Sequence, residues 1–312
     1  MILVTGSDSS QGRIILERLL ASGFQTAVLT SSDCQQTVGQ LEHQLSCFSG
    51  LRLIVHAFEL GDPRKAEHYP DLAHQFNVRP TEVIAEYAAS RAIPVIFLSS
   101  FMVFDGFKKN PYIAANSPSP ISVYGRSKAL AEKHLLDRNS HSIILRTGWL
   151  LDSTEGSWLD RQVGDAIDGL PLLCSAGHFI NPTSIHDIAN VVVAVIRQVL
   201  CSIEVWGVYH YGGNEPVSHA ELLQCIGKSL AAFLPGLEPL YEVCPPGLSP
   251  LMPVRLPVNG VLGCIKLRNT FGIKQKAWRQ ELPDLLSHRL EKVRNRDQPP
   301  DERLMAPESL PI

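Results

Sequence analysis

The sequence lacks paired cysteines, long apolar runs and an excess of charge of either sign. Its seven cysteines include no Cys-x-x-Cys pair, a pattern typical of reduced thiols in a reducing compartment, and we expect no metal site. No apolar stretch reaches the ~18 residues that a membrane span needs, and no signal peptide is recognisable. The formal net charge of -3 provides no basic field for nucleic acid. We therefore expect a cytoplasmic protein that binds neither membranes nor nucleic acid.

Strands and helices are predicted to alternate along the first half of the chain. The predicted strands are 25–30, 52–57, 94–99 and 142–146, and the predicted helices lie near 11–22, 67–91 and 124–137. Parallel strands joined by helical crossovers form a doubly wound sheet. The predicted fold class is α/β, with a Rossmann-type doubly wound parallel sheet over residues 1–150.

The second half of the chain is less regular. Gly156-Ser157-Trp158 is expected to open a helix, residues 206–211 to form a strand, and Ser218 to cap a helix. Residues 151–292 are predicted to form a smaller C-terminal substrate-binding lobe, interleaved with late core elements. Five prolines within 245–258 predict an irregular loop. The charged, proline-containing residues 293–312 are typical of a disordered tail or a crossing arm.

A glycine-containing turn follows the first predicted strand, Ile2–Thr5. Gly6 would form the tight turn and Gly12 would let the next helix pack closely on the strand, so that helix amides face a pyrophosphate. The middle glycine of the dinucleotide fingerprint is replaced by Ser9. We expect the following turn residues to bind a nucleotide cofactor: Gly6, Ser9, Ser10, Gln11 and Gly12.

The end of the second predicted strand bears on the choice of cofactor. A carboxylate near position 30 or 31 would indicate NAD(H), and an arginine there would indicate NADP(H). The sequence has Thr30-Ser31-Ser32 instead, with Asp33 late for a ribose contact. Because these hydroxyls, Ser31 above all, could bind a 2′-phosphate, we expect NADP(H) in preference to NAD(H).

Tyr124 and Lys128 lie four residues apart in a predicted helix, with Ser100 24 positions upstream at the end of a predicted strand. Residues at this spacing share a helix face, so the Lys128 ammonium could stand beside the Tyr124 phenol and lower its pKa. Such a phenol can donate a proton to a carbonyl oxygen as hydride reaches the carbon. The pattern therefore predicts carbonyl reduction.

In the order of its motifs the chain resembles the extended short-chain dehydrogenase/reductases, most closely the dTDP-4-dehydrorhamnose reductase group. That group also contains the regulatory beta subunit of methionine adenosyltransferase, which looks like a reductase but serves as a partner protein. The resemblance covers about residues 1–290 and is carried by Val4-Thr5-Gly6, Val55-His56-Ala57, Phe97-Leu98-Ser99-Ser100, Val103-Phe104-Asp105-Gly106, Tyr124-Gly125-Arg126-Ser127-Lys128, Leu145-Arg146-Thr147-Gly148-Trp149 and Asp187-Ile188-Ala189.

The resemblance implies a role for several residues. Ser100, Tyr124 and Lys128 would be the catalytic residues, with Ser100 donating a hydrogen bond to the reacting carbonyl and Lys128 also binding the cofactor ribose. Asn77 would support a proton route to the lysine or serve only as a buried helix residue, and Trp149 would contact the sugar ring. The implied cofactor contacts beyond the glycine turn and Ser31 are Ala57, Ser99, Tyr124 and Lys128.

The chain also departs from the reductase pattern around the expected substrate. Phe101 and Met102 stand where the reductases carry Asp and Tyr, so two polar groups beside the reacting ring are replaced by apolar ones. Ile14 replaces a glutamate associated with metal-linked dimers in some members. We count Ser100, Phe101, Met102 and Trp149 as substrate-binding residues, and a homodimer remains open.

Three functions fit these observations. The first is a reductase acting on a 4-keto sugar nucleotide or a diverged small-molecule ketone. The second is a non-catalytic, NADP-binding regulatory subunit, which the Ser9 replacement and the lost polar groups favour. The third is a sugar-nucleotide epimerase or dehydratase, although Phe101 and Met102 supply none of the acidic residues that a dehydratase places there.

Overall fold

A six-stranded sheet forms the centre of the larger part of the molecule. The computed structural model describes residues 1–175, 177–201, 204–244 and 254–297. The strand order is β10-β5-β4-β3-β1-β2, and every neighbouring pair is parallel. The bounds are β1 Ile2–Thr5, β2 Thr26–Leu29, β3 Leu53–His56, β4 Val95–Ser100, β5 Ser142–Thr147 and β10 Gly207–Tyr211. The predicted doubly wound parallel sheet is confirmed.

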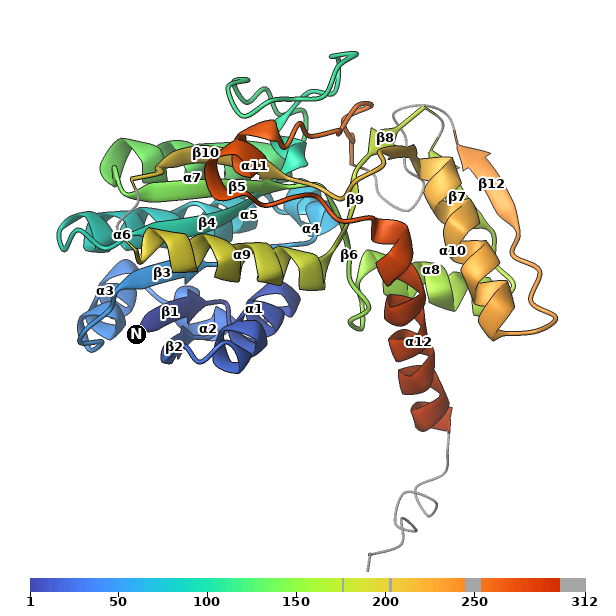
Figure 1. Ribbon diagram of the computed structural model, residues 1–312, viewed down its shortest axis with the longest axis horizontal. Coiled ribbons are helices and arrows are strands. Elements are labelled where there is room, and N and C mark those ends of the chain that lie inside the picture. Colours follow the sequence, from blue (N-terminus) through green and yellow to red (C-terminus); the bar gives the residue numbers. More distant parts are fainter. Residues whose placement is uncertain (176, 202–203, 245–253, 298–312) are drawn as a thin grey trace, which may run out of the picture.

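Helices cover both faces of this sheet (Figure 1). On one face α1 (Ser10–Ala21), α9 (Ile185–Val199) and α11 (Ile265–Phe271) bury their apolar sides together with β1, β4 and β5. On the other face α3 (Val38–Ser46), α6 (Arg79–Ala89) and α7 (Val123–Arg138) do the same. Burying both faces explains why the strands are almost wholly apolar. Within the described ranges, no helix is long and apolar enough to cross a membrane.

The predicted helix over 67–91 is wrong in its extent. The structure has α4 (Pro63–His68), α5 (Pro70–Asn77) and α6 in its place. Pro70 and Pro80 each occupy the first turn of a new helix. Proline has no amide hydrogen and tolerates only such a position, so the chain must end one helix before beginning the next.

A second, smaller part packs at one end of the sheet (Figure 1). Its core is built from α8 (Trp158–Ile167), α10 (His219–Phe233), α12 (Trp278–Asp297) and β7 (Leu172–Ser175). Short strands complete it: β6 Trp149–Leu151, β8 Phe179–Ile180, β9 Pro182–Ser184, β11 Val217–Ser218 and β12 Tyr241–Cys244. The predicted caps are confirmed, because Ser157 and Ser218 each accept a hydrogen bond from an amide in the first turn of α8 and α10.

One prediction for the second half is confirmed and one needs correction. The strand expected at 206–211 forms as β10, an edge strand of the main sheet and thus one of the late core elements expected within 151–292. The helix α12 continues to Asp297, so the expected tail cannot begin at 293. Residues 298–312 lie outside the described residues, and so do residues 245–253 of the proline-containing loop predicted at 245–258.

The strand order of the sheet indicates where a ligand would bind. β1 and β3 are neighbours in the sheet, and the chain leads from β1 to β2 on one side and from β3 to β4 on the other. Open parallel sheets bind ligands beyond the carboxyl ends of the strands at such a reversal. Ser9 and Glu59 lie in the segments that leave β1 and β3 there, and Ser100 is the last residue of β4.

Candidate active site

A cavity of about 390 Å³ opens between the carboxyl ends of the strands and the smaller lobe. Its walls bring together residues that are far apart in the sequence, from the glycine turn, the strand ends, α7 and α8. Most of the predicted site residues line it: Ser9, Ser10, Gln11, Ala57, Ser99, Ser100, Phe101, Met102, Tyr124 and Trp149. The remaining four, Gly6, Gly12, Ser31 and Lys128, lie behind or beside these walls.

The glycine turn has the predicted close packing. Gly6 adopts a φ of 64°, and a Cβ on Gly12 would lie 2.0 Å from the Gly6 carbonyl oxygen, so no other residue fits at position 12. The Ser9 hydroxyl accepts a hydrogen bond from the Gly12 amide at 3.1 Å and caps α1. Ser9 thus replaces the missing glycine with a helix cap, at the N-terminus where a phosphate would approach.

The turn after β2, where the sequence predicted a cofactor contact at Ser31, contains a carboxylate contact that sequence reasoning missed. Ser31 donates hydrogen bonds from its amide and its hydroxyl to Asp8 Oδ1, at 2.6 and 2.7 Å. Thr30 donates in the same way to Asp33. The preference for NADP(H) rested on free hydroxyls here, and the hydroxyls of Thr30 and Ser31 are already bound to carboxylates, which repel a 2′-phosphate. The sequence did contain a signal for this contact, because Asp8 is the acidic residue of the glycine turn.

Ser100 and Tyr124 line the cavity, and Lys128 contacts Glu59 of its wall. Ser100 ends β4, while Tyr124 and Lys128 lie on α7, whose first turn is fixed by a hydrogen bond from the Val123 amide to Glu67 at 2.7 Å. A Cβ on Gly125 would lie 2.1 Å from the Met102 carbonyl oxygen, so glycine lets α7 approach the segment after Ser100. The Lys128 ammonium donates to the Leu98 carbonyl at 2.6 Å.

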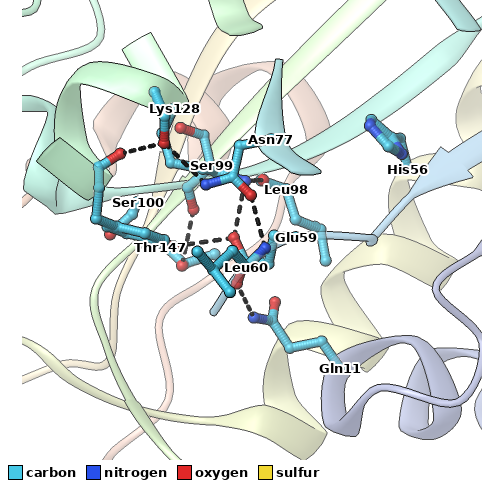
Figure 2. Close-up of polar contacts among 12 residues, drawn as sticks. Gln11, His56, Glu59, Leu60, Asn77, Leu98, Ser99, Ser100, Lys128 and Thr147 are labelled. Carbon is cyan, nitrogen blue, oxygen red and sulfur yellow. Dashed lines mark hydrogen bonds and ion pairs between the residues drawn. The ribbon is translucent and has the colours of Figure 1, made fainter. Parts of the chain in front are cut away.

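Glu59 is the second residue that the sequence did not single out, and it contacts the predicted catalytic residues directly. Its Oε2 accepts a hydrogen bond from the Tyr124 hydroxyl at 2.9 Å and lies 2.8 Å from the Lys128 ammonium. Its Oε1 accepts a hydrogen bond from the side-chain amide of Gln11 at 3.0 Å. Figure 2 shows Glu59 between Gln11 and Lys128, near the centre of the polar network.

This arrangement overturns the expected effect on Tyr124. Lys128 was expected to lower the pKa of the phenol. The pKa of Tyr124 is instead raised well above 10, first by burial and then by the charge and hydrogen bond of Glu59, while a hydrogen bond with Ser100 acts in the opposite direction. The ammonium of Lys128 is paired with Glu59, so its charge no longer favours the phenolate.

Asn77 has a structural role in this state. Its Oδ1 accepts a hydrogen bond from the Leu60 amide at 2.6 Å, and its Nδ2 donates to the Ser127 hydroxyl at 2.8 Å (Figure 2). Both polar atoms of the buried side chain are therefore used. Asn77 ties the loop that carries Glu59 to the helix that carries Tyr124 and Lys128.

Aromatic rings form one wall of the cavity. The ring of Trp149 lies 6.1 Å from that of Phe101 and 5.2 Å from that of Trp158, measured between centroids. Met102 completes this apolar wall. Arg161 also lines the cavity. The wall suits a flat or weakly polar group, with Arg161 as a partner for an anionic one.

Comparisons with known proteins agree with the fold and identify the family. The family model described as the RmlD substrate binding domain matches residues 1–290. A dTDP-4-dehydrorhamnose reductase of Aggregatibacter actinomycetemcomitans is 26% identical and covers 92% of this chain and 98% of its own. One from Sinorhizobium fredii is 33% identical over 69% of this chain and 73% of its own. The methionine adenosyltransferase 2 subunit beta of Rattus norvegicus is 26% identical, with coverages of 88% and 83%.

Solved structures share the fold. A dTDP-4-dehydrorhamnose reductase from Clostridium acetobutylicum superposes with a TM-score of 0.80 at 22% identity, over 92% of this chain and 98% of the other. One from Bacillus anthracis, in complex with NADP, gives 0.78 at 19% identity, over 92% and 98%. The chain belongs to the RmlD substrate-binding domain family, and the resemblance to the dTDP-4-dehydrorhamnose reductases and to the beta subunit is confirmed. The reductase relatives are NAD(P)-dependent oxidoreductases, the enzyme class that the sequence predicted.

Proposed function

We propose that this chain is an NAD(P)H-dependent reductase that converts a carbonyl group to an alcohol. The observation that carries the proposal is that Ser100 and Tyr124 line one cavity with Ser9, Ser10 and Gln11 of the glycine turn, while Lys128 contacts Glu59 of the same cavity wall. Gln11 of the turn and the Tyr124 and Lys128 side chains meet on the Glu59 carboxylate, so that one dinucleotide could contact both regions. Its reductase relatives support the same class.

Each residue has a defined part in this reaction. A reduced nicotinamide, when bound, supplies the hydride. Tyr124 gives the phenol proton to the carbonyl oxygen, so that ketone, hydride and proton together form the alcohol and the phenol is left as phenolate. Ser100 donates a hydrogen bond to the same oxygen as charge develops there. Solvent in the cavity then returns a proton to Tyr124.

The substrate we propose is a 4-keto sugar nucleotide or a diverged ketone that is less polar. Phe101 and Met102 give the reacting carbonyl an apolar neighbourhood, and each lost hydrogen bond to a sugar hydroxyl removes about 0.5–1.5 kcal/mol of net binding. Arg161 on the cavity wall is suited to a phosphate. A substrate held mainly through an anionic part would fit both features.

A second candidate is a nucleotide-binding regulatory subunit without turnover. The pairing of Glu59 with Lys128 favours it, because this pairing keeps the Tyr124 proton on the phenol. The beta-subunit relatives belong to the same family. Cofactor consumption separates the two candidates.

The test is NADPH and NADH oxidation by the purified protein with dTDP-4-keto-rhamnose and with a panel of less polar ketones. We expect turnover with at least one ketone and its loss in Ser100→Ala. Tight cofactor binding without turnover of any ketone would contradict the reductase proposal and support the regulatory one.

A further inference from the structure

The Glu59 carboxylate contacts three residues of the candidate active site. One oxygen meets the Tyr124 hydroxyl at 2.9 Å and the Lys128 ammonium at 2.8 Å, and the other accepts from Gln11 at 3.0 Å. The side chains of Lys128 and Glu59 are only 2% and 13% exposed. One carboxylate therefore bridges the nucleotide turn and the Tyr–Lys pair, which are the two regions that a dinucleotide must contact.

We propose that Glu59 is an internal competitor of the dinucleotide cofactor, occupying the hydrogen bonds of Tyr124 and Lys128 until the cofactor ribose displaces it. The inference rests on the proposed function, which assigns the ribose to Lys128. It makes Glu59 a positioning residue that sets cofactor affinity and controls the Tyr124 proton.

The loop geometry lets the carboxylate leave without rearranging the fold. Glu59 belongs to the segment between β3 and α4, not to a helix or strand. Its neighbour Leu60 is held through the amide by Asn77, which is itself bound to Ser127. The backbone beside Glu59 is thus fixed, and rotation of the Glu59 side chain about its own bonds is enough to release Tyr124 and Lys128.

The charges around the cleft predict the direction in which Glu59 changes the cofactor affinity. The acidic side chains on the cavity wall are Glu59, Asp62, Asp152 and Glu155, and the basic one is Arg161. Lys128 is the further cation that contacts Glu59. Neutralising Glu59 leaves the Lys128 charge uncompensated and removes one anion from a cleft that must accept a pyrophosphate. The affinity for the cofactor must then rise.

The first test compares cofactor dissociation constants of the wild-type protein, Glu59→Gln and Glu59→Ala, measured with NADPH and NADH by quenching of protein fluorescence. Glu59→Gln keeps the shape and a hydrogen-bond acceptor but loses the charge, whereas Glu59→Ala loses both. We expect both variants to bind on the order of tenfold more tightly, about 1.4 kcal/mol. Glu86→Gln makes the same charge change at an exposed side chain of α6. It is the control and should bind the cofactor as the wild type does.

The second test follows ionisation of Tyr124 in the cofactor-free protein by tyrosinate absorbance, with Tyr124→Phe and Tyr124→Phe/Glu59→Gln as matched blanks. Because Glu59 raises the pKa of Tyr124, Glu59→Gln should ionise this tyrosine at a lower pH. A role confined to holding the loop would leave the titration unchanged.

The outcomes separate the inference from the function on which it rests. If wild type binds the cofactor and the Glu59 variants bind equally or more weakly, the inference is overturned and the reductase proposal stands. If neither the wild type nor any variant binds a nicotinamide dinucleotide, both are overturned. Binding that appears only in the variants supports both.

Discussion

The Oδ1 atom of Asp8 accepts two hydrogen bonds from Ser31, one from the amide at 2.6 Å and one from the hydroxyl at 2.7 Å. This contact joins the glycine turn to the end of β2, where the cofactor's adenosine ribose is expected. A carboxylate there accepts readily from a ribose hydroxyl and repels a phosphate. We therefore expect the choice between NADP(H) and NAD(H) to depend on Asp8 as well as on the hydroxyls of 30–32.

Asp8→Asn should shift cofactor preference toward NADPH. Removing the negative charge relieves repulsion of the 2′-phosphate of NADPH and weakens the hydrogen bond that a carboxylate accepts from the ribose of NADH, so both effects change the preference in the same direction. We expect the ratio of NADH to NADPH dissociation constants to rise on the order of tenfold. Asp71→Asn, an equal change in the first turn of α5 outside the cavity, is the control. An unchanged ratio would show that Asp8 does not face the 2′ position.

Tyr124→Phe should leave NADPH affinity within a few fold and reduce turnover on the order of 10² to 10⁴, the usual value of a positioned proton donor. The measurement is a titration of NADPH binding beside a steady-state assay with the best ketone of the panel. Tyr209→Phe removes a hydroxyl that donates to the Val205 carbonyl outside the site, and it should retain activity. A fully active Tyr124→Phe enzyme would refute the assignment of the acid.

The wild-type protein should be a poor enzyme on dTDP-4-keto-rhamnose, because Phe101 and Met102 offer its hydroxyls no hydrogen-bond partner. Phe101→Asp with Met102→Tyr should raise activity on this sugar, since both positions line the cavity and would regain polar groups. Both residues are 5% exposed, so the folding of the variant is checked by its melting temperature first. Wild-type kcat/KM above about 10⁴ M⁻¹s⁻¹ on this sugar would contradict the divergence argument.

His56 should make the protein less stable in acid. Burial and then the charge of Lys128 lower its pKa from 6.5 to about 3, so the folded protein keeps His56 neutral while the unfolded chain takes up a proton. Stability is full above pH 6.5 and falls as the pH drops toward 3, by at most about 1.4 kcal/mol per pH unit for this group.

The measurement is the free energy of unfolding in urea at about pH 7.5 and about pH 5 for the wild type and His56→Asn. Between these values His56 should account for about 2 kcal/mol of the loss, so the variant should lose that much less. His210 and His219, also buried with lowered pKa, keep a residual acid sensitivity in both proteins. Equal losses of unfolding free energy in the wild type and the variant would show that His56 does not contribute to the acid sensitivity.

The sequence predicted the parts of the site that depend on local order. The strand, turn and helix around Gly6 and Gly12, and the four-residue spacing of Tyr124 and Lys128, are local patterns, and all of them occur in the structure. Ser100 was placed correctly because the end of a buried strand marks the ligand edge of a parallel sheet. The break in the helix at 67–91 was also readable, since Pro70 and Pro80 were visible in the sequence.

Glu59 could not be assigned from local pattern. It is 65 residues from Tyr124 in the chain, and only the pairing of β3 with β1 and β4 brings the two side chains together. A signal existed, because Glu59 follows the buried strand β3 at the edge where the ligand was expected. The direction of the Tyr124 pKa shift was wrong for this reason: a cation four residues away was counted, and a carboxylate far away in sequence was not.

Hydride transfer from a deuterated cofactor tests the central claim most directly. NADPH and NADH carrying deuterium at the transferable hydrogen are incubated with the protein and the ketone panel, and the products are examined by mass spectrometry. The reductase account predicts one deuterium in the alcohol for each cofactor oxidised, greatly slowed in Tyr124→Phe. Bound cofactor with no deuterium in any product would contradict it and leave a nucleotide-binding protein without turnover.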